Sequence, residues 1–418
     1  MSNRFFREML EATRLTREGR LDQATALLQR VLRGRVGSDM PPDTASKARP
    51  GIDPARRLET LGQAPPTEPA RARADVGSRH QALSAPRAPA GMQRLLGRIG
   101  SGRGPLVGRL KPATRDIVPS GGQFLTGSYA NHAGVLGYKL YIPSSYRGQT
   151  LPLVVMLHGC TQTADDFAAG TRMNAIAEER DCFVAYPEQT AAANPARCWN
   201  WFRRSDQQRG EGEPSLVAGV TRKVMRDYRV DSRRVYVAGL SAGAAAAAIL
   251  GVNYPDLYAA IGMHSGLVCG AASDLPSAVA AMRQGEITAP LFAPATAGAD
   301  GEAPVVPTIV FHGDQDLTVH PRNSVHAIAY WANRSDLRAS VHRDRVPGGH
   351  AYSRTIYRNA TGKSILEQWD IHGSGHAWSG GSAAGTFTDP RGPDASREMM
   401  RFFFEHPGGE KPTTSCVS

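Results

Sequence analysis

A serine bracketed by glycines, at the end of an apolar run, is the residue of this chain best suited to nucleophilic chemistry. The run Val235–Ala238 leads into Gly239-Leu-Ser-Ala-Gly243, and the Ala-rich stretch 242–253 that follows is typical of a helix. A sharp strand-to-helix turn crowds the backbone, so residues without side chains are needed on both sides of Ser241. Ser241 would lie at a helix N-terminus, where N–H groups can bind a negative oxygen. The pattern predicts a nucleophile.

A serine hydroxyl needs a base to take its proton and an acid to orient that base. Downstream, the apolar run Val305–Phe311 ends in His312-Gly-Asp-Gln-Asp316, and an acidic loop after a strand is where the orienting carboxylate is expected. Two aspartates compete. We favour Asp316, because in hydrolases of this pattern the acid stands three residues after the glycine of the His-Gly pair. Asp314 is the alternative candidate for the acid. If it is not the acid, its expected role is to form hydrogen bonds inside the turn.

The base is expected in a loop that follows the last strand. Ser364–Ile371 predicts that strand, and the glycine-rich loop after it carries His376. Such a loop can bring an imidazole over Ser241. The alternative is His350, which also stands in a Gly-Gly-His-Ala context. It precedes an apparent strand, Arg354–Arg358, so its place in the order is less favourable.

A developing oxyanion needs two hydrogen-bond donors. The first is expected to be the backbone N–H of Ala242, directly after the nucleophile. We assign the second to the N–H of Cys160, in the loop after the apolar run Leu151–Leu157, where Gly159 permits a close approach of the backbone. The other histidines, at 158, 312 and 320, have no metal-ligand spacing and are interpreted as structural. We therefore expect neither a metal nor a cofactor.

The elements around these residues alternate between strands and helices. Strands are predicted at Leu136–Ile142, Leu151–Leu157, Phe183–Tyr186, Val235–Ala238, Ala259–His264, Val305–Phe311 and Ser364–Ile371, and helices near 165–180, 213–228, 242–253, 321–335 and 394–406. Alternation with nearly continuous apolar strands predicts the α/β class, with a mostly parallel sheet covered by helices on both faces. Ligands of such sheets bind beyond the carboxyl ends of the strands. Each candidate residue follows such an end.

The positive charge of the chain is concentrated in its N-terminal quarter. Residues 1–112 contain 21 basic residues (Lys and Arg) against 10 acidic ones (Asp and Glu), whereas residues 113–418 contain 28 basic and 28 acidic residues. We expect a basic helical hairpin at 1–33, a disordered linker rich in Arg, Ala, Pro and Gly at 34–112, a catalytic domain at 113–410 and a disordered tail at 411–418. The charge balance of the catalytic domain argues against nucleic-acid binding there. The hairpin could bind a membrane, a granule or a protein, or pack as a helical pair.

Together the motifs resemble those of the polyhydroxybutyrate (PHB) depolymerase family of esterases, relatives of feruloyl and acetyl-xylan esterases, over about residues 120–406. The motifs are His158-Gly-Cys-Thr-Gln162, Cys198-Trp-Asn-Trp-Phe202, Gly239-Leu-Ser-Ala-Gly243, His312-Gly-x-x-Asp316 and Gly375-His-Ala-Trp-Ser-Gly-Gly381. The resemblance implies an α/β-hydrolase fold, a triad of Ser241, Asp316 and His376, and hydrolysis of esters such as (R)-3-hydroxybutyrate oligomers. The alternatives are a feruloyl or acetyl-xylan esterase, and a non-catalytic granule- or membrane-binding protein on the same scaffold.

Further expectations depend on this resemblance. It implies that Cys160 and Cys198 approach each other and either form a disulfide or remain buried thiols. Trp199 and Trp378 are expected to bind substrate, because flat amphipathic rings suit an apolar polyester. The family implies an extracellular protein, whereas the first residues contain no secretory signal and indicate a cytoplasmic one. Only about a dozen residues follow the last predicted helix, which favours oligomers or amorphous granules over crystalline polymer as substrate.

Overall fold

A computed structural model describes residues 117–285, 305–332 and 336–409 of the chain. The predicted hairpin at 1–33, the linker at 34–112 and the tail at 411–418 lie outside these ranges. All of the described residues belong to the predicted catalytic domain.

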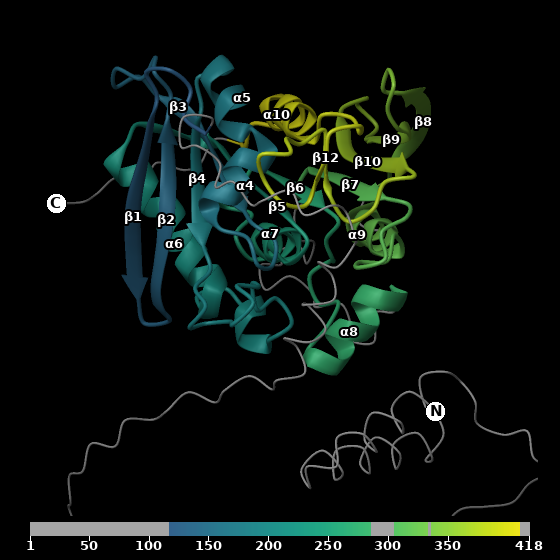
Figure 1. Ribbon diagram of the computed structural model, residues 1–418, viewed down its shortest axis with the longest axis horizontal. Helices are drawn as coiled ribbons and strands as arrows, with labels where there is room; N and C mark the ends of the chain where they lie inside the picture. Colours follow the sequence, from purple (N-terminus) through teal and green to yellow (C-terminus); the bar gives the residue numbers. More distant parts are fainter. Residues whose placement is uncertain (1–116, 286–304, 333–335, 410–418) are drawn as a thin grey trace, which may run out of the picture. The chain divides into compact units, whose positions relative to one another are not determined.

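The described residues form a ten-stranded sheet, with strand order β1-β2-β4-β3-β5-β6-β7-β10-β9-β8 (Figure 1). Its strands are β1 (Gln123–Asn131), β2 (Gly134–Ile142), β3 (Leu151–Leu157), β4 (Phe183–Glu188), β5 (Val230–Leu240), β6 (Ala260–His264), β7 (Thr308–Gly313), β8 (Arg338–Arg345), β9 (Ala351–Arg358) and β10 (Ser364–His372). The six central strands are β4, β3, β5, β6, β7 and β10, and each pairs in parallel with its neighbours in this group. Strands β1 and β2 on one side, and β9 and β8 on the other, pair antiparallel. A separate two-stranded pair joins β11 (Trp378–Ser379) to β12 (Thr388–Asp389).

The seven predicted core strands are confirmed to within a few residues, and the apparent strand at Arg354–Arg358 lies in β9. Strands β1 and β8, which have no apolar run, were missed. The edge strands β1 and β8 are largely exposed along their length, so their sequences carry no core-facing signal. Their place in the sheet depends on pairing with neighbours, which local composition does not reveal.

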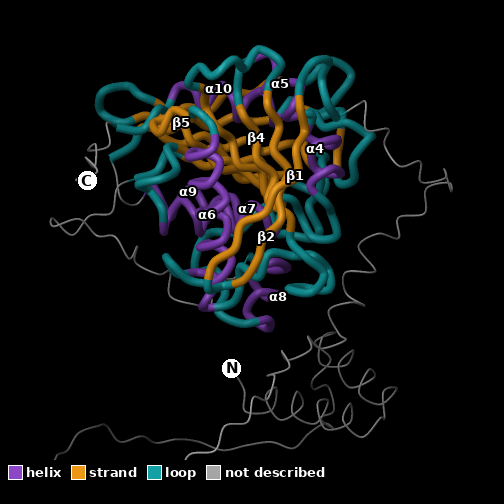
Figure 2. The backbone as a smooth tube through the Cα atoms, turned by 90° about the vertical axis from the view of Figure 1, so that its left-hand side faces the viewer, coloured by secondary structure: helices purple, strands orange, loops and turns teal. Residues whose placement is uncertain are grey.

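Helices cover both faces of the sheet, as Figure 2 shows. They are α4 (Ala164–Thr171), α5 (Met173–Glu179), α6 (Gly212–Asp227), α7 (Ala242–Asn253), α8 (Leu275–Gln284), α9 (Arg322–Ala332) and α10 (Ala395–Glu405). Alternate residues of β3 face opposite sides: Leu153 and Val155 pack with the core of α6 to α9, and Val154 with that of α4, α5 and α10. The helix expected at 165–180 is two helices, because Arg172 takes the left-handed conformation between them. Helix α8 was not predicted.

No helix within the described ranges combines the length and apolarity needed to cross a membrane.

The register of the central strands brings their carboxyl ends to one edge of the sheet. Leu240 of β5 pairs with His264 of β6, and His264 with Phe311 of β7. Phe311 in turn pairs with Trp369 of β10. Residues that follow β5, β7 and β10 therefore emerge side by side.

Strand β10 is fixed to its surroundings by a buried carboxylate. Glu367 has 1 % of its side chain exposed and accepts hydrogen bonds from Arg354 of β9, at 2.9 Å, and from Arg401 of α10, at 2.7 Å. One side chain thus joins two strands and a helix in the N-terminal half of β10.

Removal of this carboxylate is expected to destabilise the domain. The variant Glu367→Ala should lower the free energy of unfolding by about 3 kcal/mol, because two guanidinium groups lose a buried partner. Glu405→Ala is the control: it removes the Arg401–Glu405 pair, whose glutamate is 50 % exposed, and should cost less than about 0.5 kcal/mol. Urea denaturation measures both, and equal effects of the two substitutions would contradict the assignment.

Candidate active site

Ser241 occupies a strained turn between strand β5 and helix α7. Its φ of 58° and ψ of −119° lie in a region that residues with side chains rarely adopt. A Cβ at Gly243 would lie 2.1 Å from the carbonyl oxygen of Leu157, and one at Gly239 would lie 2.4 Å from the carbonyl of Gly243. Both glycines are therefore required for α7 to cross the end of β3 this closely. The strain is maintained by the packing around it and presents the serine at the sheet edge.

His376 and Asp316 form a hydrogen-bonded pair beyond the ends of β10 and β7. The Nδ1 atom of His376 lies 2.7 Å from Oδ2 of Asp316, while Oδ1 of Asp316 accepts the N–H groups of Thr318 and Val319 at 2.9 and 2.8 Å. A carboxylate acceptor at Nδ1 places the proton there and leaves Nε2 as the basic atom of the ring. Burial alone would raise the pKa of Asp316, but hydrogen bonds from His312 and His376 lower it well below its usual range. The carboxylate therefore stays ionised at neutral pH.

The acid and histidine loops are held together through their backbones. Gln315 donates its N–H to the carbonyl of Ser374 at 3.0 Å, and Asp314 donates to Ile371 at 3.1 Å. A Cβ at Gly313 would lie 2.3 Å from the carbonyl oxygen of Ser374, so only glycine allows this contact. The glycine of the His-Gly pair, from which the spacing to Asp316 was counted, is thus required on steric grounds.

The two rival candidates have other partners. Asp314 lies 3.1 Å from Nδ1 of His372, whose Nε2 lies 2.9 Å from the hydroxyl of Ser353. This is a second Ser–His–Asp chain, but Ser353 is in the middle of β9, paired on both sides in the sheet, and does not begin a helix. His350 contacts Asp389 at 2.8 Å. Neither rival contacts the pair formed by His376 and Asp316.

Two buried histidines complete the surroundings of Asp316. His312 contacts the carbonyl of Val319 through Nε2, at 2.8 Å, and lies 3.4 Å from Asp316. His264 accepts the N–H of Ser379 at 3.0 Å, and burial, with His312 and His376 nearby, lowers its pKa to about 3. On the sequence alone His312 is interpreted as structural, and His264 has no assigned role. The sequence signal that could have identified these two histidines is a polar residue at the end of a wholly apolar strand.

The segment proposed for the oxyanion passes the N-terminus of α7. A Cβ at Gly243 would lie 2.6 Å from the carbonyl oxygen of His158, two residues before Cys160. Within the described part of the chain, neither the N–H of Cys160 nor that of Ala242 donates to a protein acceptor. Cys160 is bonded to Cys198 in a disulfide, one of the two alternatives that the sequence left open. Both N–H groups are therefore available to a negatively charged oxygen.

The structure contradicts the predicted substrate contacts of Trp199 and Trp378. Trp199 is 0 % exposed and donates its Nε1 hydrogen to the carbonyl of His158. Trp378 is 1 % exposed, donates to Ser396, and stacks on His264 with ring centroids 5.2 Å apart. Large apolar rings are more stable inside the core than on the surface of a loop. Both indole rings therefore pack against the loops of the site on the side that faces the core.

No group of three or more His, Cys, Asp or Glu side chains within the described ranges is arranged to hold a metal ion.

A serine at a strained elbow and a partly buried His–Asp pair, at the carboxyl edge of a parallel sheet covered on both faces, define the α/β-hydrolase fold. Residues 136–334 match the sequence profile of the family described as Esterase PHB depolymerase.

Individual proteins are also similar to this chain. The chain is 30 % identical to poly(3-hydroxyalkanoate) depolymerase C of Paucimonas lemoignei over 254 residues, which cover 60 % of each protein. It is 26 % identical to the probable acetylxylan esterase A of Aspergillus clavatus over 208 residues, 47 % of this chain and 66 % of the relative. The chain thus spans less than two thirds of the length of both relatives. The solved acetyl xylan esterase from Aspergillus awamori superposes with a TM-score of 0.52 at 20 % identity, over 68 % of this chain and 99 % of that one, and shares the fold.

Acid is expected to destabilise the domain through His264. The folded state keeps this ring neutral, whereas the unfolded chain binds a proton below a pKa of about 6.5. The stability that depends on the neutral ring is complete above pH 6.5 and is lost as the pH falls towards 3. Between pH 7 and 4.5 the free energy of unfolding should fall by about 2–3 kcal/mol more in the wild type than in His264→Gln. Urea denaturation at the two pH values measures the difference.

The control is His132→Gln, which changes a histidine with 65 % of its side chain exposed and should keep the wild-type pH dependence. The assignment is wrong if His264→Gln loses as much stability in acid as the wild type.

Proposed function

We propose that this protein is a serine carboxylic-ester hydrolase that acts through an acyl-enzyme. The observation that carries the proposal is the partly buried His376–Asp316 pair, at 2.7 Å, at the same edge of the sheet as a serine in strained elbow geometry. In this proposal Ser241 is the nucleophile, His376 the general base and Asp316 the group that orients it.

The reaction proceeds in two acyl-transfer steps. Nε2 of His376 takes the hydroxyl proton of Ser241 as the oxygen attacks the ester carbonyl, and the imidazolium then gives that proton to the leaving alcohol. The N–H groups of Cys160 and Ala242 stabilise the oxyanion of each tetrahedral intermediate. Water, deprotonated by the same imidazole, attacks the acyl-enzyme and releases the acid and free Ser241.

As substrate we propose poly- or oligo-(R)-3-hydroxybutyrate or similar short hydroxyalkanoate esters. Support comes from the five motifs and from the similarity to a poly(3-hydroxyalkanoate) depolymerase. A carbohydrate esterase is the second candidate, favoured by the acetylxylan esterase relatives. The excess of positive charge in residues 1–112 supports a role for that segment in binding a granule or membrane surface.

Replacement of the nucleophile is the direct test of the catalytic assignment. Ser241→Ala should reduce turnover of p-nitrophenyl butyrate by at least about 10³-fold without unfolding the protein, because the attacking oxygen is lost. A fluorophosphonate probe should label the wild type at Ser241 only. The matched control is Ser353→Ala, which removes the serine of the exposed Ser–His–Asp chain and should keep activity within twofold of the wild type. Near-normal turnover by Ser241→Ala would exclude it as the nucleophile.

An ester panel decides the substrate class. We expect kcat/KM for (R)-3-hydroxybutyrate oligomers to exceed that for acetylated xylan and for feruloyl sugars, and the reverse order would favour the carbohydrate esterase. Failure to hydrolyse any ester, with no labelling of Ser241, would indicate a binding protein on this scaffold. The same panel without residues 1–112 should give unchanged turnover of soluble esters and reduced binding to granules.

A further inference from the structure

We propose that Glu213, at the start of helix α6, is a positioning residue that fixes the oxyanion-binding segment 158–160. The inference rests on the proposed function, because it concerns the donor that Cys160 contributes to the same site. It assigns a role to a carboxyl group that the acyl-transfer mechanism does not use.

Glu213 accepts hydrogen bonds from two buried amide residues. Its Oε1 accepts from Nε2 of Gln189 and from Nδ2 of Asn200, both at 2.5 Å, and its Oε2 accepts the backbone N–H of Asn200 at 2.7 Å. Gln189 and Asn200 are 2 % and 1 % exposed. These partners of the carboxylate are all donors. Without it the two Asn200 groups would lose their acceptor, and Nε2 of Gln189 would keep only the carbonyl of Cys198, at 3.3 Å.

Both amide residues lead directly to the oxyanion-binding segment. Gln189 donates its backbone N–H to Nε2 of His158 at 3.0 Å. Asn200 is the neighbour of Trp199, which donates to the carbonyl of His158 at 3.1 Å, and follows Cys198, which is bonded to Cys160. The carboxylate therefore constrains both the ring and the backbone carbonyl of His158, the residue that follows strand β3.

A second chain of hydrogen bonds connects Asn200 to Thr161, the residue that follows Cys160. The carbonyl of the Asn200 side chain accepts from Asn194 at 3.0 Å, whose own side-chain carbonyl accepts the N–H of Ala196 at 2.9 Å. Ala196 then accepts the N–H of Thr161 at 2.7 Å. Hydrogen bonds traceable to one carboxylate thus constrain the residues on both sides of Cys160.

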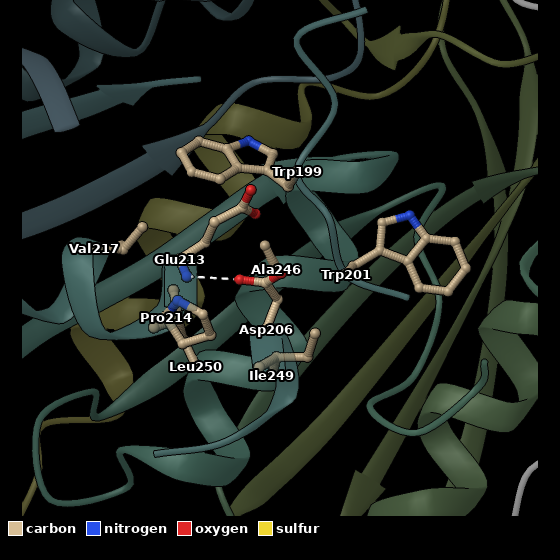
Figure 3. Close-up of a pocket in the computed structure, with 9 residues that line it drawn as sticks. All are labelled: Trp199, Trp201, Asp206, Glu213, Pro214, Val217, Ala246, Ile249 and Leu250. Atoms are coloured by element: carbon tan, nitrogen blue, oxygen red, sulfur yellow. Dashed lines mark hydrogen bonds between the residues drawn. The ribbon is translucent and has the colours of Figure 1, made fainter. Parts of the chain in front are cut away.

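Glu213 is itself held rigidly. It lies in the first turn of α6, where a negative charge is favoured by the helix dipole, and its N–H donates to Oδ1 of Asp206 at 2.8 Å. Figure 3 shows the carboxylate directed towards Trp199, above a small cavity that is also lined by Trp201 and by Ala246 of α7. Burial, with Asp206 nearby, raises the pKa of Glu213 to about 7. The group is thus enclosed on the side of the core.

Such support is needed because the segment after β3 has no regular structure of its own. Residues 158–160 belong to no helix or strand, and Thr161 has a φ of 68°. An oxyanion donor must stay within tenths of an ångström of its working position, and a displacement of about 1 Å can lower the rate about 10²-fold. The disulfide fixes the Cys160 side chain, whereas the hydrogen bonds fix the peptide groups.

The test compares Glu213→Ala and Glu213→Gln with the wild type. The alanine removes every acceptor, and the glutamine keeps one carbonyl oxygen but turns an N–H group against the N–H of Asn200. We expect kcat for p-nitrophenyl butyrate to fall about 10- to 100-fold in the alanine variant and by a smaller factor in the glutamine variant, with KM within twofold of the wild type. Amide hydrogen exchange of residues 158–162 should become faster, and that of α7 should not change. Glu211→Ala, two residues earlier at a side chain that is 59 % exposed, should leave both readouts unchanged.

The proposal is overturned if folded Glu213 variants keep kcat within twofold of the wild type, or if kcat falls while exchange in 158–162 stays the same. Equal acceleration of exchange throughout the domain would also overturn it, because it would indicate general destabilisation. If the wild type hydrolyses no ester, the proposed function fails, whereas the exchange readout still decides whether Glu213 fixes the segment.

Discussion

The N-terminus of helix α7 crosses the carboxyl end of strand β3 at a distance that only glycine permits, and the whole site depends on this crossing. Any side chain at Gly243 would meet the carbonyl oxygens of Leu157 and His158 at less than 3 Å. The contact places the start of α7, with the N–H of Ala242, against the segment that contains Cys160. It also keeps Ser241 in a conformation that would relax without it.

Electrostatics around Asp316 follow from burial. The carboxylate is enclosed with two histidines that hydrogen-bond to it, and a third, His264, is too deeply buried to be charged at neutral pH. A low-dielectric surrounding strengthens the attraction between Asp316 and a positive charge on His376. In the proposed mechanism an imidazolium on His376 would lie beside this ionised carboxylate, and the neutral His264 adds no competing positive charge.

A second layer of residues holds the loops that carry these groups. Trp378 packs behind the histidine loop, and Trp199 packs behind the segment with Cys160. The network of Glu213 lies behind Trp199 in turn. Their contribution is rigidity, since loops without regular structure keep a fixed geometry only when other elements constrain them.

The local sequence was sufficient to predict the elbow, the seven core strands and the polar residues that follow the ends of those strands. Each of these depends on signals within a few residues: glycines where the backbone is crowded, apolar runs where strands are buried, and polar residues just after strand ends. The choice of Asp316 and His376 over Asp314 and His350 came from order and spacing alone, and their pairing is visible only in the folded chain.

Only the tertiary structure decided which side chains face the interior and what they contact there. It buried the two tryptophans expected at the surface, placed the edge strands β1 and β8, and connected Glu213 to a segment more than fifty residues earlier in the chain. The physical reason is that burial and hydrogen-bond partners depend on elements distant in sequence. Glycines at crowded turns and apolar runs of strand length, by contrast, are signals that the local sequence carries by itself.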